Sequence, residues 1–258
     1  MGKSKGDLLT CDWNPIIGCE RYSPGCRLCW YLDGIFPWQQ HLGNIPAGVR
    51  SSEHHVFKKR MDVSYLRKMK GIVGVIQHGD LFWEHVPDST INTVLDIVDM
   101  VAVARSDSTK YVLWTKRAER MAKILSRRYP SGLPYHLAVS VSVENQMIAD
   151  ERLPHLVSLH GVRMIMIEPM LGPINLEPYL PVEWIVVGSE TGKPANHPLP
   201  VDLDWVRSVR DIAQRYCIPF FIKQLDNRHD LPTRELDGRE WNEDRKSTRL
   251  NSSHRIRS

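Results

Sequence analysis

Short apolar runs with high strand propensity recur from residue 71 onward, and amphipathic segments separate them. Most of these runs are apolar almost throughout, which is typical of parallel strands covered on both faces. One further strand is expected at residues 8–13, so the sequence predicts seven strands in all. The six later runs are GIVGVIQ (71–77), KYVLWT (110–115), HLAVSVS (136–142), RMIMIEP (163–169), EWIVVGS (183–189) and IPFFIKQ (218–224).

The segments between the runs have the apolar spacing of helices. Asp88 and Ser89 can cap a helix whose apolar face spans 91–101, a second helix is expected around 121–125, and a third follows Asp202. This alternation predicts right-handed βαβ units in an α/β protein. Seven strands, with no GxGxxG motif after the first, favour a partial or complete (β/α) barrel of parallel strands, TIM-like, over a Rossmann sheet.

Residues 1–245 are predicted to form a single barrel domain, with an N-terminal cysteine loop at 11–31 and a loop-rich insert at 36–60 beside it. Residues 246–258 are polar and aperiodic and resemble translated vector sequence, so we expect a non-native, disordered tail there. This tail carries four Lys and Arg residues and no acid, which equals the formal net charge of +4. The remainder is close to neutral and gives no support for strong sequence-independent DNA binding.

The sequence also indicates the compartment. No apolar run reaches the length of a membrane-spanning helix, and the first ten residues contain no signal-peptide core, so we expect a cytoplasmic protein without membrane contact. Five cysteines, an odd number with three of them inside eleven residues, argue against a disulfide framework and for a metal site in a reducing compartment. Cys217 stands apart from the others, and we expect it to be a small buried apolar side chain.

Cys19, Cys26 and Cys29 lie in the segment WNPIIGCERYSPGCRLCWY, with the spacing Cys-x6-Cys-x2-Cys. Prolines and glycines on either side, including Pro24 and Gly25, fold this segment tightly enough for the three thiols to converge. The sequence therefore predicts that these three cysteines form a metal site.

Two metal chemistries compete for the three cysteines. Structural zinc needs four ligands, and the fourth would have to be Cys11 or a histidine such as His41, His54 or His55. A four-iron cluster held by only three cysteines leaves one iron open to a substrate or cofactor. Because the sequence contains no second CxxC pair, the spacing favours the cluster, although it leaves zinc open.

Polar side chains follow six of the predicted strands where each strand ends. In a barrel these ends share one face, which is the active-site face of such folds. Each residue alone could instead cap a helix or form a turn, but the recurrence on six strands predicts a site. The candidates are Gly79 and Asp80, Thr115 and Lys116, Ser142, Glu144 and Asn145, then Glu168, Glu190 and Lys223.

Together the segments WNPIIGCERYSPGCRLC, HGDLF, WTKRAERM, SVSVENQ, IEPMLGPI, VVGSETG and IPFFIKQ resemble the phage-associated three-Cys-motif family of unknown function, which is described as radical-SAM-like. The match runs in order through nearly all of residues 11–241. The resemblance implies a barrel with a [4Fe–4S] cluster and S-adenosyl-L-methionine (SAM), whose cleavage gives a radical that abstracts hydrogen from a substrate. The cysteine spacing of this chain, Cys-x6-Cys-x2-Cys, departs from the usual radical-SAM spacing CxxxCxxC. The resemblance also implies an electron donor such as flavodoxin or ferredoxin, and a nucleotide or nucleic acid as the candidate substrate.

The same resemblance suggests roles for the residues at the strand ends. Gly79 and Asp80 would lie near the methionine amino group of SAM, and Thr115 and Lys116 would bind an anionic group. Ser142, Glu144 and Asn145 would bind the ribose hydroxyls, unless Ser142 caps the helix that follows and Glu144 lies in its first turn. Glu168, Glu190 and Lys223 would orient substrate or act in acid–base chemistry, with a structural Glu168–Lys223 ion pair as the alternative.

A different class of function remains open on the sequence alone. The same cysteines could form a structural metal site, with zinc or an iron–sulfur cluster that only stabilises the barrel. The barrel would then bind nucleic acid or a protein partner without radical chemistry.

Overall fold

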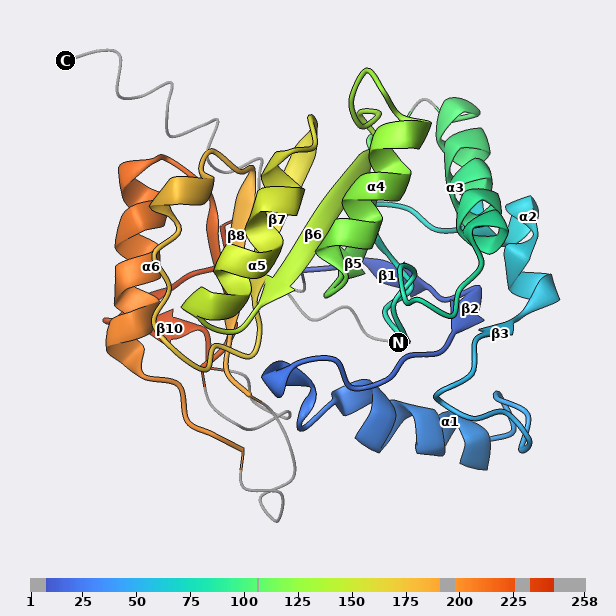
Figure 1. Cartoon of the computed structure of the whole chain (residues 1–258), viewed down its shortest axis with the longest axis horizontal. Coiled ribbons are helices and arrows are strands. Elements are labelled where there is room, and N and C mark those ends of the chain that lie inside the picture. Colours follow the sequence, from blue (N-terminus) through green and yellow to red (C-terminus); the bar gives the residue numbers. More distant parts are fainter. Residues whose placement is uncertain (1–7, 106, 191–197, 226–232, 244–258) are drawn as a thin grey trace.

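The computed structural model describes residues 8–105, 107–190, 198–225 and 233–243. Seven strands form one parallel sheet in the order β1-β4-β5-β6-β7-β8-β9, and this sheet curls into an open half-barrel (Figure 1). The expected α/β class and the partial barrel are confirmed, and each of the seven strands predicted from the sequence is present. The strands are β1 Cys11–Trp13, β4 Ile72–Val75, β5 Lys110–Thr115, β6 Leu137–Val143, β7 Val162–Ile167, β8 Trp184–Gly188 and β9 Phe220–Gln224.

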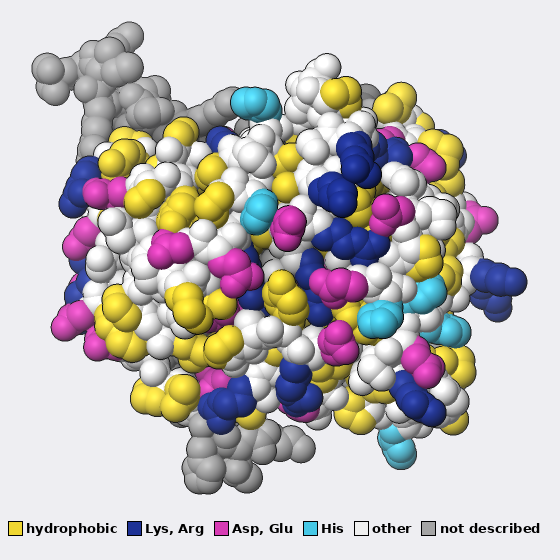
Figure 2. Space-filling model, in the orientation of Figure 1, with side chains coloured by type: hydrophobic (Ala, Val, Ile, Leu, Met, Phe, Trp, Pro, Cys, Tyr) yellow, Lys and Arg dark blue, Asp and Glu magenta, His cyan; other side chains and the backbone are white. Residues whose placement is uncertain are grey.

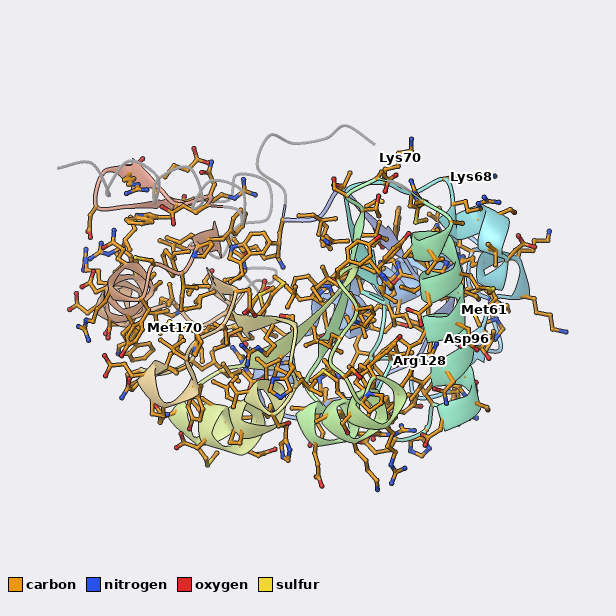
Figure 3. All side chains as sticks on the ribbon, turned by 90° about the horizontal axis from the view of Figure 1, so that it is seen from above. Met61, Lys68, Lys70, Asp96, Arg128 and Met170 are labelled. Atoms are coloured by element: carbon orange, nitrogen blue, oxygen red, sulfur yellow. The ribbon has the colours of Figure 1, made fainter. Side chains whose placement is uncertain are left out.

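Four helices cover the outer side of the sheet and form an arc around it when the molecule is seen from above (Figure 3). Each follows a strand, as expected for right-handed crossovers between parallel neighbours. They are α3 Asp88–Val103, α4 Ala118–Arg128, α5 Gln146–Val157 and α6 Leu203–Arg215. The helix expected after Asp202 is present, and Asp202 caps it, since its carboxylate accepts a hydrogen bond from the N–H of Asp204.

The start of α3 differs from the prediction. Pro87 occupies the N-cap, and Asp88, expected to be the cap, is instead the first helical residue. Proline suits the N-cap here, because its fixed φ fits the extended backbone of that residue. The Asp88 carboxylate forms an ion pair with Arg120 of α4 at 2.6 Å, so it joins two helices.

The remaining elements are short. Residues 36–60, expected to be loop-rich, contain a six-residue helix and one short strand. These elements are β2 Ile16–Ile17, α1 Phe36–His41, β3 His55–Val56, α2 Val63–Leu66, β10 Glu235–Leu236 and β11 Arg239–Glu240, with 3-10 turns at Pro24–Cys26, Lys58–Met61 and Glu177–Tyr179 and a π-helical turn at Tyr31–Ile35.

The two faces of the sheet carry separate apolar clusters because successive side chains of a strand point to opposite sides. The larger cluster lies between the sheet and the helices, and Leu113, Val139 and Ile165 belong to it. The smaller one lies on the concave inner face and includes Met166 and Phe221. The inner face of the half-barrel is therefore an apolar floor that no helix covers in the described part of the chain.

Cys217 contradicts its expected burial. It follows α6 with a positive φ of 55°, and its side chain is exposed. The left-handed backbone at Cys217 turns the chain away from the apolar face of α6. The apolar spacing of the helix therefore does not extend to Cys217, and its side chain is not buried.

Charged side chains of both signs are interspersed over the helix-covered face (Figure 2). None of the helices in the described ranges combines the length and apolar character that a membrane crossing needs. The tail expected at 246–258 lies outside the described residues.

A half-buried polar cluster joins α3 to α4 and to the start of β6. The Asp99 carboxylate accepts hydrogen bonds from Arg128 at 2.8 Å, from the Tyr129 hydroxyl at 2.9 Å and from His136 Nε2 at 2.9 Å. Figure 3 shows Arg128 facing α3, where it also pairs with Asp96 at 2.7 Å. Burial alone would raise the pKa of Asp99, but these hydrogen bonds outweigh it and hold the pKa below its ordinary value of 3.8.

Replacing Asp99→Asn should lower the free energy of unfolding by about 1–3 kcal/mol, because buried partners lose a charged acceptor. Since the folded pKa is depressed, the contribution of Asp99 is fully present above its unfolded pKa of about 3.9 and is lost as the pH falls through the folded value. Urea unfolding at pH 7 and at pH 3 measures both effects. Asp211→Asn, an exposed residue of α6, is the control and should change little; equal stability of both variants would contradict the assignment.

Candidate functional site

A cavity of about 990 Å³ opens at the carboxyl edge of the half-barrel and extends over its concave face. Trp114, Met166 and Phe221 contribute apolar wall from the inner face, and the residues after the strands contribute polar groups. Eleven of the thirteen residues predicted from the sequence line it, namely Cys19, Cys26, Cys29, Gly79, Asp80, Thr115, Lys116, Ser142, Glu168, Glu190 and Lys223. The ends of these strands therefore lie around one cavity, while the roles given to the residues stay predictions.

The cysteine loop reaches the sheet through two glycines. Gly18 forms a parallel bridge with Gly79, the residue that follows β4, and their φ values are 130° and 143°. A Cβ on Gly79 would lie 2.7 Å from the Gly18 carbonyl oxygen, and a Cβ on Gly18 would lie 2.7 Å from the carbonyl oxygen of Glu53. Only glycine fits such positions. The bridge places Cys19 beside Asp80, at the carboxyl edge of the sheet.

The three thiols lie in different electrostatic surroundings. Burial, followed by the negative charge of Asp80, raises the pKa of Cys19 to about 12. Burial also raises the pKa of Cys29, and the neighbouring Cys26 adds to this effect. For Cys26 burial acts in the same direction, but the Lys116 ammonium and hydrogen bonds at Ser23 outweigh it and lower the pKa. The mutual influence of the thiols indicates that they lie near one another.

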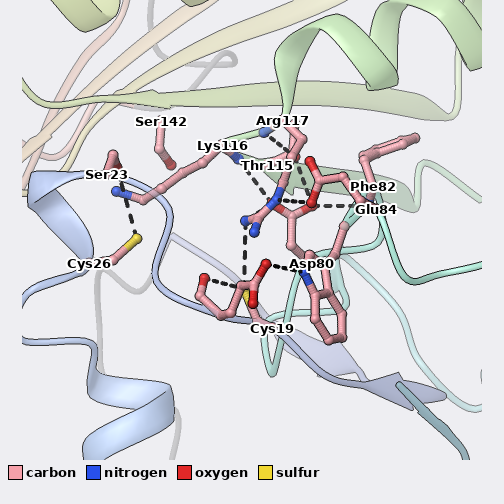
Figure 4. Close-up of polar contacts among 12 residues, drawn as sticks. Cys19, Ser23, Cys26, Asp80, Phe82, Glu84, Thr115, Lys116, Arg117 and Ser142 are labelled. Atoms are coloured by element: carbon pink, nitrogen blue, oxygen red, sulfur yellow. Dashed lines mark hydrogen bonds and ion pairs between the residues drawn. The ribbon is translucent and has the colours of Figure 1, made fainter. Parts of the chain in front are cut away.

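Arg117 and Asp80 form the polar centre of the site (Figure 4). The Asp80 carboxylate accepts hydrogen bonds from the Thr115 hydroxyl at 2.7 Å and from the N–H of Lys116 at 3.1 Å, and it pairs with the Arg117 guanidinium at 3.3 Å. Arg117 also donates to the Cys19 sulfur at 3.6 Å. Arg117 and Asp80 are both buried, so this pair ties the ends of β4 and β5 to the cysteine loop.

Glu144 lies behind the cysteine loop. Its fully buried carboxylate accepts a hydrogen bond from the Ser23 hydroxyl at 2.6 Å and pairs with Lys116 and, at 3.4 Å, with Arg152. It also packs against Gly25, where a Cβ would collide with it. Glu144 therefore supports the turn that carries Cys26, and it is absent from the residues found to line the cavity.

Asn145 also lies away from the cavity. It caps α5, where its side chain accepts a hydrogen bond from the N–H of Ile148 at 3.1 Å. Of the three residues expected at the ribose, Ser142 alone lies among those found to line the cavity. The capping alternative at Ser142 is therefore wrong, because the N-cap of α5 is Asn145 and Glu144 precedes the helix.

The far side of the cavity carries two ion pairs. Lys223 pairs with Glu168 at 2.7 Å, which confirms the predicted pair, although the Lys223 side chain is 42% exposed and the pair is not fully buried. Glu190 pairs with Arg27 and accepts a hydrogen bond from the N–H of Leu199 at 2.8 Å. Arg27 was not predicted, but its position between Cys26 and Cys29 is the signal that could have identified it.

Several buried polar atoms that belong to cavity residues have no hydrogen-bond partner within the described chain. They are Nε2 of Gln77, Nε1 of Trp114, Nη2 of Arg117, Oε1 of Glu190 and the hydroxyl of Tyr31. Buried polar groups are nearly always paired, so such atoms indicate where a polar ligand would bind.

Of the candidates for a fourth metal ligand, Cys11 lies at the cavity and the three histidines do not lie among its lining residues. Cys11 lines the same cavity, and its thiol points to the Lys70 carbonyl oxygen at 3.9 Å. His41, His54 and His55 are not among the residues found to line it. Among the described residues, no group of three or more His, Cys, Asp or Glu side chains is arranged to hold a metal ion.

The fold and the site define an open (β/α) half-barrel with a cysteine-lined cavity at the carboxyl edge of its sheet. The chain belongs to the family described as "Protein of unknown function (DUF5131)", whose model matches residues 4–245. No curated protein and no solved structure matches the chain.

Replacing Gly79→Ala should lower the free energy of unfolding by about 1–3 kcal/mol, because the new Cβ meets the Gly18 carbonyl and the positive φ is strained. Thermal unfolding followed by circular dichroism measures the change. Gly34→Ala is the matched control, since nothing lies within 4 Å of a Cβ at that position. If both variants unfold at the same temperature, the Gly18–Gly79 contact does not anchor the cysteine loop.

Proposed function

We propose that this protein is a radical-SAM-like enzyme, in which Cys19, Cys26 and Cys29 hold a [4Fe–4S] cluster and the adjoining cavity holds SAM and a substrate. The observation that carries the proposal is that the three thiols line the same cavity as the polar residues at the strand ends. The resemblance of the cysteine loop and strand ends to the phage-associated three-Cys-motif family also supports it.

The three cysteines suit a cluster better than a closed zinc site. They provide three thiol donors at one cavity, and the histidines considered as a fourth ligand are not among the residues that line it. A cluster with three protein ligands would have one iron without a protein ligand, and that iron would be free to bind a cofactor. The cationic groups of Lys116 and Arg117 would partly offset the negative charge of three thiolates.

When bound, such a cluster supplies the electron that cleaves the sulfonium of SAM into methionine and a 5′-deoxyadenosyl radical, and the radical then abstracts hydrogen from a substrate. The unpaired Arg117 Nη2 can donate to an anionic group such as a carboxylate. The unpaired Glu190 Oε1 can accept from an ammonium or a hydroxyl group. Trp114 offers an aromatic ring and an unpaired N–H at the same cavity.

On the other side, Glu168 and Lys223 can orient a polar substrate or exchange a proton with it, because both line the cavity and neither is fully buried. Asp80 cannot bind an amino group freely, since Arg117 and Thr115 already engage its carboxylate. We therefore propose that Asp80 positions Arg117 and that Glu190 is the carboxylate facing the ligand. An electron donor such as flavodoxin or ferredoxin would supply the electron in a reducing cytoplasm.

Anaerobic reconstitution with iron and sulfide should give a brown protein that converts SAM to 5′-deoxyadenosine when dithionite is added. Cys19→Ala, Cys26→Ala and Cys29→Ala should each abolish both the colour and the product, because one thiolate fewer leaves a second iron without a protein ligand. Absorption spectroscopy and chromatography of the products measure the two outcomes.

Cys217→Ala is the matched control, since Cys217 is exposed and is not among the cavity residues, and it should keep full activity. A colourless protein with stoichiometric zinc after reconstitution would indicate a structural zinc site in a barrel that binds nucleic acid or a protein partner. A brown protein without SAM cleavage would mean a structural cluster. Either result rejects the proposed reaction.

Cluster loading should increase with pH between about 6.5 and 8.5, because Cys19 and Cys29, whose pKa values are raised by burial, must lose protons on binding iron. Each released proton changes the apparent affinity by about tenfold per pH unit. Iron retained at a fixed, limiting supply measures the effect. Lys116→Met should shift the loading curve to higher pH, since the ammonium that lowers the pKa of Cys26 is removed; a loading curve independent of pH would contradict thiol deprotonation.

A further inference from the structure

The segment 58–70, KKRMDVSYLRKMK, concentrates positive charge in a chain that is otherwise close to neutral. It contains six Lys and Arg residues and a single acid, Asp62. It forms the 3-10 turn Lys58–Met61 and the helix α2 next to it. We call the five exposed cationic side chains of this segment the basic ridge: Lys58, Lys59, Arg67, Lys68 and Lys70.

The ridge charges are not neutralised by carboxylates within the described residues. None of the five ridge side chains forms an ion pair with an acid of those ranges, whereas Arg128 of α4 and Arg207, Arg210 and Arg215 of α6 do. Asp62 caps α2, where it accepts a hydrogen bond from the N–H of Ser64 at 2.8 Å. Figure 3 shows Lys68 and Lys70 projecting outward near α2, at one end of the arc of helices.

The ridge adjoins the cavity, because two residues of the same segment line it. These residues are Arg60 and Tyr65. Arg60 is fixed to the strand β1, since it donates to the Asn14 carbonyl at 3.0 Å and its own carbonyl accepts from the Trp13 indole at 2.8 Å. The basic ridge is therefore held at the β1 edge of the cavity.

Aromatic side chains are exposed between the ridge and the cysteine loop. Tyr65 is 38% exposed and Trp30 is 43% exposed, and both line the cavity. Tyr65 belongs to the segment that carries the ridge, and Trp30 belongs to the cysteine loop. Exposed rings together with cations form the usual platform for single-stranded nucleic acid, since bases stack on the rings while the cations contact phosphates.

We infer that the basic ridge binds the phosphates of a single-stranded polynucleotide and that the cavity takes one of its bases. Lysine is depleted at protein–protein interfaces, whereas runs of Lys and Arg bind phosphate through counterion release, so the ridge fits a polynucleotide better than a protein partner. A base can enter the cavity only when it is unpaired, so a single strand fits better than a duplex.

The role of this polynucleotide as substrate rests on the proposed function, but its binding does not require the cluster. Trp114 and Phe221 provide aromatic walls for the base, and Arg60, from the segment that carries the ridge, lines the same cavity. The three cysteine thiols also line this cavity, so a base bound there would lie at the site where hydrogen abstraction is proposed.

Fluorescence anisotropy with a fluorescein-labelled mixed-sequence oligodeoxynucleotide of about fifteen nucleotides tests the inference on the full chain. We expect binding that weakens as salt is raised from about 50 to 200 mM. The double variant Lys59→Glu/Lys68→Glu should bind at least about tenfold more weakly. Its salt slope should fall by about 1.4, because each phosphate of a single strand that a cation neutralises contributes about 0.7 to the slope.

The matched control is Lys123→Glu/Arg127→Glu, which makes the same change in charge at exposed positions of α4 on the outer side of the half-barrel. It should bind within about twofold of the unmodified protein. Circular dichroism melting of both variants separates weaker binding from a failure to fold. Tyr65→Leu keeps the ridge charge and should weaken binding by at least about fivefold, since it removes stacking on one ring.

Four results would overturn the inference. They are the same affinity for the ridge variant and the α4 variant, duplex binding as tight as single-strand binding, SAM cleavage without oligonucleotide binding, and binding of flavodoxin through the ridge without binding of the oligonucleotide. Because anisotropy is measured without iron or SAM, oligonucleotide binding without SAM cleavage would reject the proposed reaction alone, and SAM cleavage without oligonucleotide binding would reject the ridge alone.

Discussion

The close backbone contact between Gly18 and Gly79 is the constraint on which the site depends. The parallel sheet gathers the ends of six strands at one edge, but the cysteines precede those strands in the chain and must be brought back to them. The glycine bridge does this, because the absence of two side chains lets the cysteine loop cross directly over the end of β4. Cys19 then reaches Arg117, and Ser23 reaches Glu144.

Charge balance around the cavity follows from this crossing. Buried carboxylates are costly unless they are paired, and here each one has a cationic partner: Asp80 pairs with Arg117, Glu144 with Lys116 and Glu190 with Arg27. Two of these partners, Lys116 and Arg117, also act on the thiols. The residues that support the loop therefore also act on the pKa values of its cysteines, which would couple the proposed metal binding to the fold.

The open half-barrel leaves room for a large ligand beside the cysteines. An uncovered, apolar concave face provides aromatic and thioether contacts, while the carboxyl edge provides polar atoms that lack partners within the described chain. The basic ridge at the β1 edge shows why an average charge can mislead. Residues 1–245 are close to neutral, yet six of the thirteen residues at 58–70 are Lys or Arg, and association with phosphate depends on that local density.

The sequence by itself determined the seven parallel strands, because buried parallel strands are apolar throughout, and it determined that polar residues at their ends meet. It also indicated that the three cysteines converge, and it offered the Glu168–Lys223 ion pair as an alternative; the structure contains both features. Tertiary structure alone decided that Glu144 and Asn145 lie behind the cavity, that Asp80 is engaged by Arg117, and that Cys217 is exposed. These outcomes depend on side-chain partners distant in the chain and on backbone torsions at single residues, which neither periodicity nor spacing encodes.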